Sequence, residues 1–201
     1  MTRYRDTART QLRDAIVDAA RELTVANGWD SVRMAQVADR VGVSRQTVYN
    51  EFANKAGLAE ALAQREVARF VADVRTNLFA HGDDVATGAH AAILHVLREA
   101  AGNPLIKAIL TSSRDGTDPL LPFLTTRAEV VLTAATQVLT DWAAAYLPAV
   151  DETAFAFAAE SVVRLVVSHI VLPTAPVETT ALNLTTLALH LIAAASAAPS
   201  R

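Results

Sequence analysis

The chain has 201 residues, a formal net charge of −3 and 52 % hydrophobic residues, so it has enough apolar side chains to bury a large core and is not expected to be disordered. It contains no cysteine, which excludes disulfide scaffolds, thiolate zinc sites and cysteine nucleophiles. The first residues carry both charge signs and no apolar run, so we expect no signal peptide and a cytoplasmic location.

The first two helices are predicted from apolar residues that recur at steps of three and four. The first of them is expected to end at Gly28. Asp30 or Ser31 is positioned to cap a second, shorter helix, and Gly42 is positioned to end it. Residues 1–55 hold nine Lys and Arg against seven Asp and Glu, so this part of the chain is the better candidate to bind a polyanion.

A third short helix and a long fourth helix follow. Ser44 stands where an N-cap residue belongs, and the third helix is predicted over Arg45–Phe52. Asn54 is the next N-cap candidate, and it precedes a long helix that begins at Lys55 and runs toward residues 81–82.

Beyond residue 82 the predicted helices lengthen, alanine becomes abundant and charged residues become fewer. Proline follows a capping residue at 103–104 and again at 118–119, which is typical of helix starts. We predict helices near residues 84–101, 104–113, 122–147, 152–171 and 179–197. The sequence therefore predicts an all-α protein, with a three-helix domain over residues 1–55 joined by a long helix to a larger helical bundle over residues 56–201.

One stretch has the length of a membrane span. The residues from Thr179 to Ser200 carry no formal charge and are long enough to cross a bilayer. Asn183, His190 and several threonines and alanines leave little net transfer energy into lipid. We therefore expect a helix buried against protein, and no membrane partner.

The second and third helices have the pattern of a helix-turn-helix. Val48 and Phe52 are four residues apart, so both face inward on the third helix. Its remaining faces show Arg45, Gln46, Thr47, Tyr49 and Asn50 to solvent. These residue types read base edges and bind phosphates, so the pattern favours a helix that enters the major groove of DNA. A helical hairpin with a merely polar outer face is the alternative.

At these residues the sequence resembles the DNA-binding region of TetR-family transcriptional regulators. The resemblance rests on Gly28-Trp29-Asp30-Ser31, the run VADRVGVSRQTVYNEF at 37–52, Asn54-Lys55 and Leu58. It covers roughly residues 9–62, and beyond them only length, helix number and composition are similar. The third helix also looks like those of members associated with lipid and alkane genes.

The resemblance implies a homodimer that binds a palindromic operator on double-stranded DNA and releases it when a small molecule enters the C-terminal bundle. The DNA-binding residues it implies are Ser31, Ser44, Arg45, Gln46, Thr47, Tyr49, Asn50 and Lys55. Tyr49 and Lys55 match phosphate-contacting positions, and Ser31 matches the hydroxyl position that opens the second helix. Glu51 departs from the family pattern, because a carboxylate there repels phosphate unless it points away.

The bundle has the apolar composition of a receptor for hydrophobic or lipid-like effectors. Isolated polar groups and large apolar ones mark the expected pocket. The candidate ligand-binding residues are His95, Ile109, Arg114, Phe123, Trp142, Phe155, Arg164 and His169. For Arg164 the alternative is an ordinary ion pair with Glu160, four residues earlier.

The last two helices are the candidate dimer interface, because small and apolar residues on one face permit close helix approach. The expected interface residues are Phe155, Ala158, Ala159, Val162, Val166, Leu184, Leu187 and Leu191. Packing within one chain uses the same composition and is the alternative.

The other functional classes lack a motif. The five histidines include no pair at three- or four-residue spacing, so no helix presents two of them to one metal ion. No glycine-rich phosphate loop or nucleophile elbow occurs either. We therefore predict no catalytic residues, no metal and no cofactor. A helical lipid-binding or carrier protein without DNA binding remains the alternative to a ligand-responsive repressor.

Overall fold

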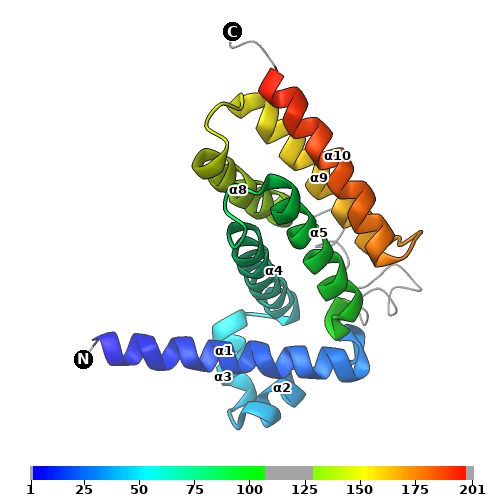
Figure 1. The fold of residues 1–201 in the computed structure, drawn as a ribbon. Helices are drawn as coiled ribbons and strands as arrows, with labels where there is room; N and C mark the ends of the chain where they lie inside the picture. The colour runs from blue at the N-terminus through cyan, green and yellow to red at the C-terminus, as the bar shows by residue number, and fades with distance from the viewer. Residues whose placement is uncertain (1, 107–128, 198–201) are drawn as a thin grey trace. The chain divides into compact units, whose positions relative to one another are not determined.

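The computed structural model describes residues 2–106 and 129–197, and every regular element among them is a helix, as Figure 1 shows. The elements are α1 (Thr2–Asn27), η1 (Trp29–Ser31), α2 (Met34–Val41), α3 (Arg45–Phe52), α4 (Lys55–Phe79), α5 (Val85–Gly102), α8 (Glu129–Tyr146), α9 (Glu152–Val171) and α10 (Val177–Ala197). The predicted all-α class is confirmed.

The chain divides into two compact units. The first, called the head below, comprises the described residues up to Glu66 together with residues 103–106. The second, called the bundle, comprises residues 67–102 and 129–197. Helix α4 contributes to both units.

The head is built from α1, α2, α3 and the start of α4 around one small core. The fully buried side chains come from each of these elements, and the core includes Ile16, Val37, Val48, Leu58 and Leu62. Gly42 ends α2 in the left-handed conformation, at φ 77° and ψ 32°, which a residue without a Cβ adopts at low cost. This is the turn that the sequence predicts between the two short helices.

The start of α2 differs from the prediction. Helix α2 begins at Met34, and the main-chain N–H of Arg33 donates to the Gln36 side-chain oxygen at 2.9 Å. Ser31 lies in η1 instead, where its hydroxyl is 2.8 Å from the carbonyl oxygen of Asn27 and 2.9 Å from that of Gly28. The prediction that Asp30 or Ser31 caps α2 was wrong, because the Ser31 hydroxyl closes the end of α1.

A tight turn joins α3 to α4. Ala53 has φ 57° and ψ −49°, and the N–H of Asn54 donates to the carbonyl of Phe52 at 2.5 Å, which makes a γ-turn of the rare positive-φ kind. The side-chain oxygen of Asn54 accepts from the N–H of Gly57 at 2.9 Å, so the predicted cap of α4 is confirmed. A Cβ added to Gly57 would clash with the carbonyl oxygen of Phe52, so this close approach requires glycine.

Helix α1 is connected by ion pairs to each of the other three helices of the head, α2, α3 and α4. The pairs to α2 and α4 are Glu22–Arg40 at 3.0 Å, Asp18–Arg65 at 2.7 Å and Arg21–Glu66 at 3.0 Å. The pair to α3 is described with the site below. Three of the four helices of the head thus take their positions from contacts with the fourth.

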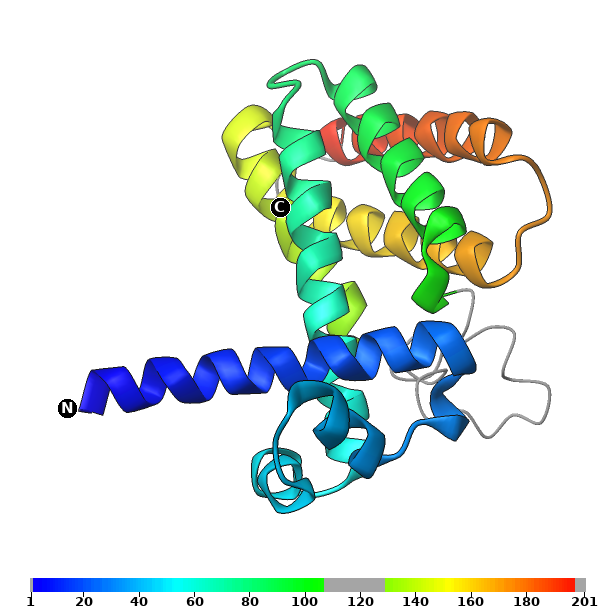
Figure 2. The same ribbon diagram turned by 90° about the horizontal axis from the view of Figure 1, so that it is seen from below.

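In the bundle, α9 and α10 form an antiparallel pair, α5 packs on α10, and α8 packs on α9 (Figures 1 and 2). Two apolar clusters fill the interior. The first consists of Leu78, Ala92, Val138, Trp142, Ala143, Phe155 and Ala159. The second consists of Ile93, Val96, Leu97, Val166, Ala181, Leu184 and Ala188. Each cluster draws residues from three or four helices, so the bundle is held by contacts that are distant in sequence.

The helix bounds agree closely with the sequence predictions where a local cap or turn sets them. Helices α3 and α9 have the predicted bounds, and the Asp151 side chain caps α9 by accepting from the N–H of Ala154 at 2.7 Å. Helix α10 begins two residues earlier than predicted. The predicted helix 104–113 and the start of the predicted helix 122–147 fall largely on residues 107–128, outside the described part of the chain.

Candidate nucleic-acid interface

Helix α3 is only eight residues long, so it depends on capping and packing for its stability. Ser44 is its N-cap, and the Ser44 hydroxyl oxygen accepts from the N–H of Thr47 at 3.0 Å. The hydroxyls of Ser44 and Thr47 are 2.8 Å apart. On the inner face Val48 and Phe52 are buried in the head core, as the sequence predicts.

The outward face of α3 carries two side-chain pairs at four-residue spacing. The Arg45 guanidinium donates to the Tyr49 hydroxyl at 3.2 Å and lies 5.3 Å from the centre of its ring. The Gln46 amide donates to the Asn50 side-chain oxygen at 2.9 Å. The hydrogen bond with Tyr49, followed by attraction to its oxygen, raises the pKa of Arg45. This face presents a guanidinium, two amides and a phenol on one helix.

Lys55 has partners inside the head. Its ammonium donates to the carbonyl of Asp30 at 3.1 Å and lies 5.2 Å from the centre of the buried Trp29 ring. These contacts explain a lysine at the start of α4 without a phosphate, which the sequence alone does not.

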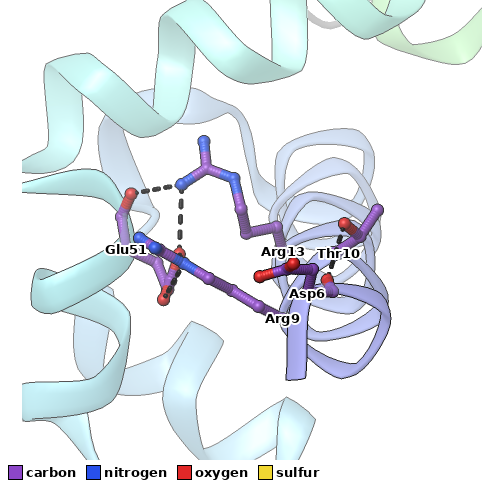
Figure 3. Close-up of polar contacts among 5 residues, drawn as sticks. All are labelled: Asp6, Arg9, Thr10, Arg13 and Glu51. Carbon is purple, nitrogen blue, oxygen red and sulfur yellow. Dashed lines mark hydrogen bonds and ion pairs between the residues drawn. The ribbon is translucent and has the colours of Figure 1, made fainter. Parts of the chain in front are cut away.

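The side chain of Glu51 points from α3 toward two arginines of α1, Arg9 and Arg13, as Figure 3 shows. The Nε atom of Arg9 is 3.0 Å from each carboxylate oxygen of Glu51. Arg13 donates through Nη1 to the Glu51 carboxylate at 3.2 Å and to the Glu51 main-chain carbonyl at 2.6 Å. The Arg13 guanidinium also lies 4.4 Å from the centre of the Phe52 ring. We call Arg9, Arg13 and Glu51 the α1–α3 clamp.

The clamp explains how a carboxylate at residue 51 is compatible with a helix that would bind DNA. Glu51 is two residues past Tyr49, or about 200° around the helix, so it faces α1 and not the outward face. Burial by itself raises the pKa of Glu51, but the hydrogen bonds and charges of Arg9 and Arg13 outweigh it and lower the pKa. The carboxylate is therefore ionised and neutralised on the inner side of α3.

Sequence reasoning treated Glu51 only as a departure and missed both arginines. A signal was present, because Arg9 and Arg13 are four residues apart and share one face of α1. Their partner could not be named, because it lies 42 and 38 residues further along the chain.

The candidate ligand-binding residues of the bundle fall into four groups. Trp142 and Phe155 share the first apolar cluster, and the buried atoms Nε2 of His95 and Nε1 of Trp142 have no hydrogen-bond partner among the described residues. Arg164 is instead on the surface and paired with Glu160 at 2.6 Å, which was the alternative prediction. His169 lies in the last turn of α9, partly exposed. The other candidates, Ile109, Arg114 and Phe123, lie outside the described residues.

Most of the candidate dimer residues face the interior of one chain. Phe155, Ala158, Ala159, Val166 and Leu184 are buried, and Val162 and Leu191 are partly buried. Only Leu187 is exposed, at 37 %. The buried residues follow the alternative prediction of packing within one chain. The two helices bury that stripe against α5, α8 and each other, which leaves the neighbouring stripe outward.

That outward stripe is apolar as well. Its large exposed side chains are Phe157 and Leu165 on α9, Leu172 directly after α9, and Leu182 and Leu187 on α10. Both helices are also long and apolar enough to pass a length-and-composition test for membrane spans, and only 28 % and 33 % of the tested windows is buried inside the protein. Much of the apolar surface of α9 and α10 is therefore uncovered in a single chain.

Comparison with known proteins adds the family. The sequence model described as "Bacterial regulatory proteins, tetR family" matches residues 16–62, and the model described as "Bacterial Tetracyclin repressor, C-terminal domain" matches residues 84–190. The HTH-type transcriptional regulator AlkX of Mycobacterium tuberculosis is 30 % identical over 171 residues, which cover 85 % of this chain and 80 % of that protein. The HTH-type transcriptional activator FasR of Mycolicibacterium smegmatis is 37 % identical over 70 residues, about a third of each chain.

Among solved structures, the TetR family repressor AlkX from Dietzia sp. strain DQ12-45-1b is similar with a TM-score of 0.71 and 29 % identity. The match covers 89 % of this chain and 94 % of that one, and the Dietzia protein is described as implicated in biodegradation of n-alkanes. The helix-turn-helix in the head and the helical bundle agree with both family matches. The chain therefore belongs to the TetR family of bacterial transcriptional regulators, which are DNA-binding proteins and not enzymes.

Proposed function

We propose that this protein is a homodimeric repressor that binds a palindromic operator through α3 of each copy and is released by a hydrophobic or lipid-like small molecule. The observation that carries the proposal is the outward face of α3, where Arg45, Gln46, Tyr49 and Asn50 stand together on a capped helix. We assign DNA binding to residues 1–55 and effector binding and dimerisation to residues 56–201. The site of action is the cytoplasm, where the DNA is.

In the proposed complex α3 lies in the major groove. Arg45, Gln46 and Asn50 would read base edges, since a guanidinium pairs with guanine and side-chain amides pair with adenine. Hydroxyl and ammonium groups would bind phosphates and fix the register. The proposed phosphate-binding group consists of Ser31, Ser44, Thr47, Tyr49 and Lys55. In the dimer the two α3 helices would be about 34–36 Å apart, one turn of DNA, or a multiple of it.

The second copy would cover the outward stripe of α9 and α10. Phe157, Leu172 and Leu182 are 73 %, 70 % and 60 % exposed in a single chain, and large exposed apolar patches mark protein interfaces. Apart from the exposed Glu160–Arg164 ion pair on α9, the two helices carry few charged groups, so the stripe suits a second copy of itself across a twofold axis. We therefore replace the buried residues of the predicted interface by this stripe and keep Leu187 in it.

The effector would bind in the bundle near Trp142 and His95. An indole N–H can only donate, and a buried donor without a partner carries a desolvation cost that an acceptor from a ligand removes. The Dietzia repressor AlkX, described as implicated in biodegradation of n-alkanes, supports a link to hydrocarbon metabolism. The indole N–H of Trp142 favours an effector with an apolar chain and an oxygen acceptor over a plain hydrocarbon.

Replacing Trp142 by Phe tests this assignment. The change removes the unpaired N–H together with some apolar volume, so the free energy of unfolding is expected to change by no more than about 1 kcal/mol. The concentration of 1-dodecanol or dodecanoate that releases half of the bound DNA is expected to rise about tenfold, because the acceptor loses its donor. Dodecane, which has no acceptor, is expected to release less DNA than either from the wild type.

Trp29 supplies the matched control, because it is fully buried in the head and its Nε1 atom also has no hydrogen-bond partner in the described part of the chain. Trp29→Phe is expected to leave the effector concentration unchanged. An equal shift in both variants, or none in Trp142→Phe, would remove Trp142 from the effector site.

The test of the DNA-binding proposal is selection of genomic duplex fragments by the purified protein, followed by fluorescence anisotropy titrations at two salt concentrations. We expect one inverted repeat, and a binding constant that falls steeply with salt.

Arg45→Ala is expected to weaken the free energy of operator binding by about 1–3 kcal/mol and to relax specificity at one base pair. Tyr49→Phe removes only a hydroxyl, so it is expected to weaken binding to all duplexes slightly and equally.

A uniform loss on all sequences in Arg45→Ala would make Arg45 a phosphate contact. Absence of enrichment at low salt, repeated after lipid has been stripped from the protein, would overturn the DNA-binding proposal and favour a lipid carrier.

A further inference from the structure

We propose that Glu51 is a positioning residue for DNA recognition: through the α1–α3 clamp it sets the orientation of the last turn of α3. This inference rests on the proposed DNA-reading role of α3. Glu51 faces α1, on the side of α3 opposite to Tyr49, so it acts on DNA only through the placement of its neighbours.

The clamp provides a hydrogen-bond donor for a main-chain carbonyl at the C-terminal end of α3. The last four carbonyls of a helix lack partners within it, and an eight-residue helix has few others to hold it. Arg13 donates to the carbonyl of Glu51 at 2.6 Å, and its positive charge lies at the negative end of the helix dipole. The same guanidinium covers the ring of Phe52, the last residue of α3. One arginine thus holds both the main chain and the final side chain of α3.

The carboxylate adds the second attachment. The Glu51 side chain is 11 % exposed, and Arg9 contacts both of its oxygens at 3.0 Å. Two contacts from one guanidinium nitrogen and a third from Arg13 restrict rotation of α3 about its own axis. Because α1 is also ion-paired to α2 through Glu22 and to α4 through Asp18, the orientation of α3 is defined relative to the whole head.

Orientation matters because the base-reading atoms lie at the tips of long side chains. With side chains a helix has a radius of about 5–6 Å, so a rotation of about 15° moves a tip by about 1.5 Å. Binding groups need to be held within about 0.5 Å to keep their contacts. Asn50 and Tyr49 directly precede Glu51, so a loosened last turn moves them first.

Two rival roles predict different results. If Glu51 only stabilised the fold, its loss would lower the melting temperature and leave the affinity of the folded protein for DNA unchanged. If Glu51 only repelled phosphates, its neutralisation would strengthen binding to every duplex. A positioning role predicts weaker binding to the operator, with little change on unrelated DNA.

The experiment compares Glu51→Gln with Glu66→Gln in the full-length protein, on the selected operator and on an unrelated duplex of equal length. Glu66 is a matched control, because it also pairs with an arginine of α1, at 3.0 Å and with 17 % of its side chain exposed, but it lies on α4. Melting temperatures are recorded for both variants. We expect about tenfold weaker operator binding in Glu51→Gln, less than about twofold change on the unrelated duplex, and no loss of operator affinity in Glu66→Gln.

Arg9→Gln provides a second variant. Arg9 lies on α1, so the sequence of α3 is unchanged, and its side chain is 63 % exposed, so the fold is expected to tolerate the substitution. It is expected to weaken operator binding in the same direction. The double variant, Arg9→Gln with Glu51→Gln, is expected to lose no more operator affinity than Glu51→Gln alone, because the two substitutions remove the same ion pair. The salt dependence of binding is expected to stay the same in Arg9→Gln; a shallower dependence would make Arg9 a phosphate contact and overturn its part in the clamp.

Unchanged operator affinity in Glu51→Gln, with Arg45→Ala still impaired, would overturn the positioning role and leave the proposed function intact. Stronger binding to both duplexes would overturn it in favour of simple repulsion. Failure of the wild type to bind any duplex would instead refute the proposed function itself.

Discussion

Leu182→Glu is expected to convert the protein to a monomer and to weaken binding to a palindromic operator by about 10²–10⁴-fold, because two linked half-site contacts are reduced to one. Leu182 is 60 % exposed on α10, and Leu187 on the same helix is 37 % exposed. A carboxylate there would be buried without a partner in the dimer, which is strongly unfavourable. In the single chain it would remain in water, so the fold is expected to survive.

Sedimentation velocity measures the oligomeric state, and anisotropy measures binding to the full operator and to a half-site. Ala86→Glu is the control, because Ala86 is exposed in the first turn of α5, where an acidic residue suits the helix dipole. It is expected to stay dimeric. A dimeric Leu182→Glu protein with full operator affinity would move the interface away from the outward stripe of α9 and α10.

Gly57→Ala is expected to reduce the free energy of unfolding by about 2–3 kcal/mol and to disrupt DNA binding. The added methyl group would collide with the main-chain carbonyl of Phe52, and a carbonyl in a γ-turn cannot move aside as a flexible side chain does. The displacement would be passed directly to the last turn of α3. Urea denaturation followed by circular dichroism measures the loss.

Two other substitutions control for helix propensity and for local strain. Gly102→Ala in α5 meets nothing within 4 Å, so it is expected to be neutral or slightly stabilising. Ala53→Gly, in the same junction as Gly57, relieves the positive φ of 57° and is expected to stabilise the protein by about 1 kcal/mol. Equal effects of Gly57→Ala and Gly102→Ala would show that the junction tolerates a side chain at residue 57.

The α3–α4 junction (residues 53–57) and the α1–α3 clamp both act on the last turn of α3. The clamp attaches α3 to α1 at Glu51, and Gly57 lets α4 approach Phe52, the next residue. The orientation of the proposed recognition helix is thus set by contacts on its inner side, away from the face that would meet DNA. Substitutions there are expected to change DNA affinity without touching DNA.

Sequence alone predicts the helices and their ends correctly wherever a local signal specifies them. Ser44 as the cap of α3, Gly42 as the left-handed turn and Asn54 as the cap of α4 were all predicted, because each acts within three or four residues of itself. The motif from Gly28 to Leu58 was also enough to indicate the family. Ser31 is the exception, since two helix ends compete for its hydroxyl and local rules do not rank them.

The partners of residues far apart in the chain follow from the packed fold and not from local sequence signals. An apolar stripe on α9 or α10 is the same in sequence whether it faces its own chain or a second copy, so burial of Phe155 and exposure of Phe157 required the packed bundle. Glu51 looked unfavourable in isolation and became a neutralised contact once Arg9 and Arg13 lay beside it. The physical reason is that caps and turns depend on near neighbours, whereas ion pairs and buried faces depend on elements brought together from far along the chain.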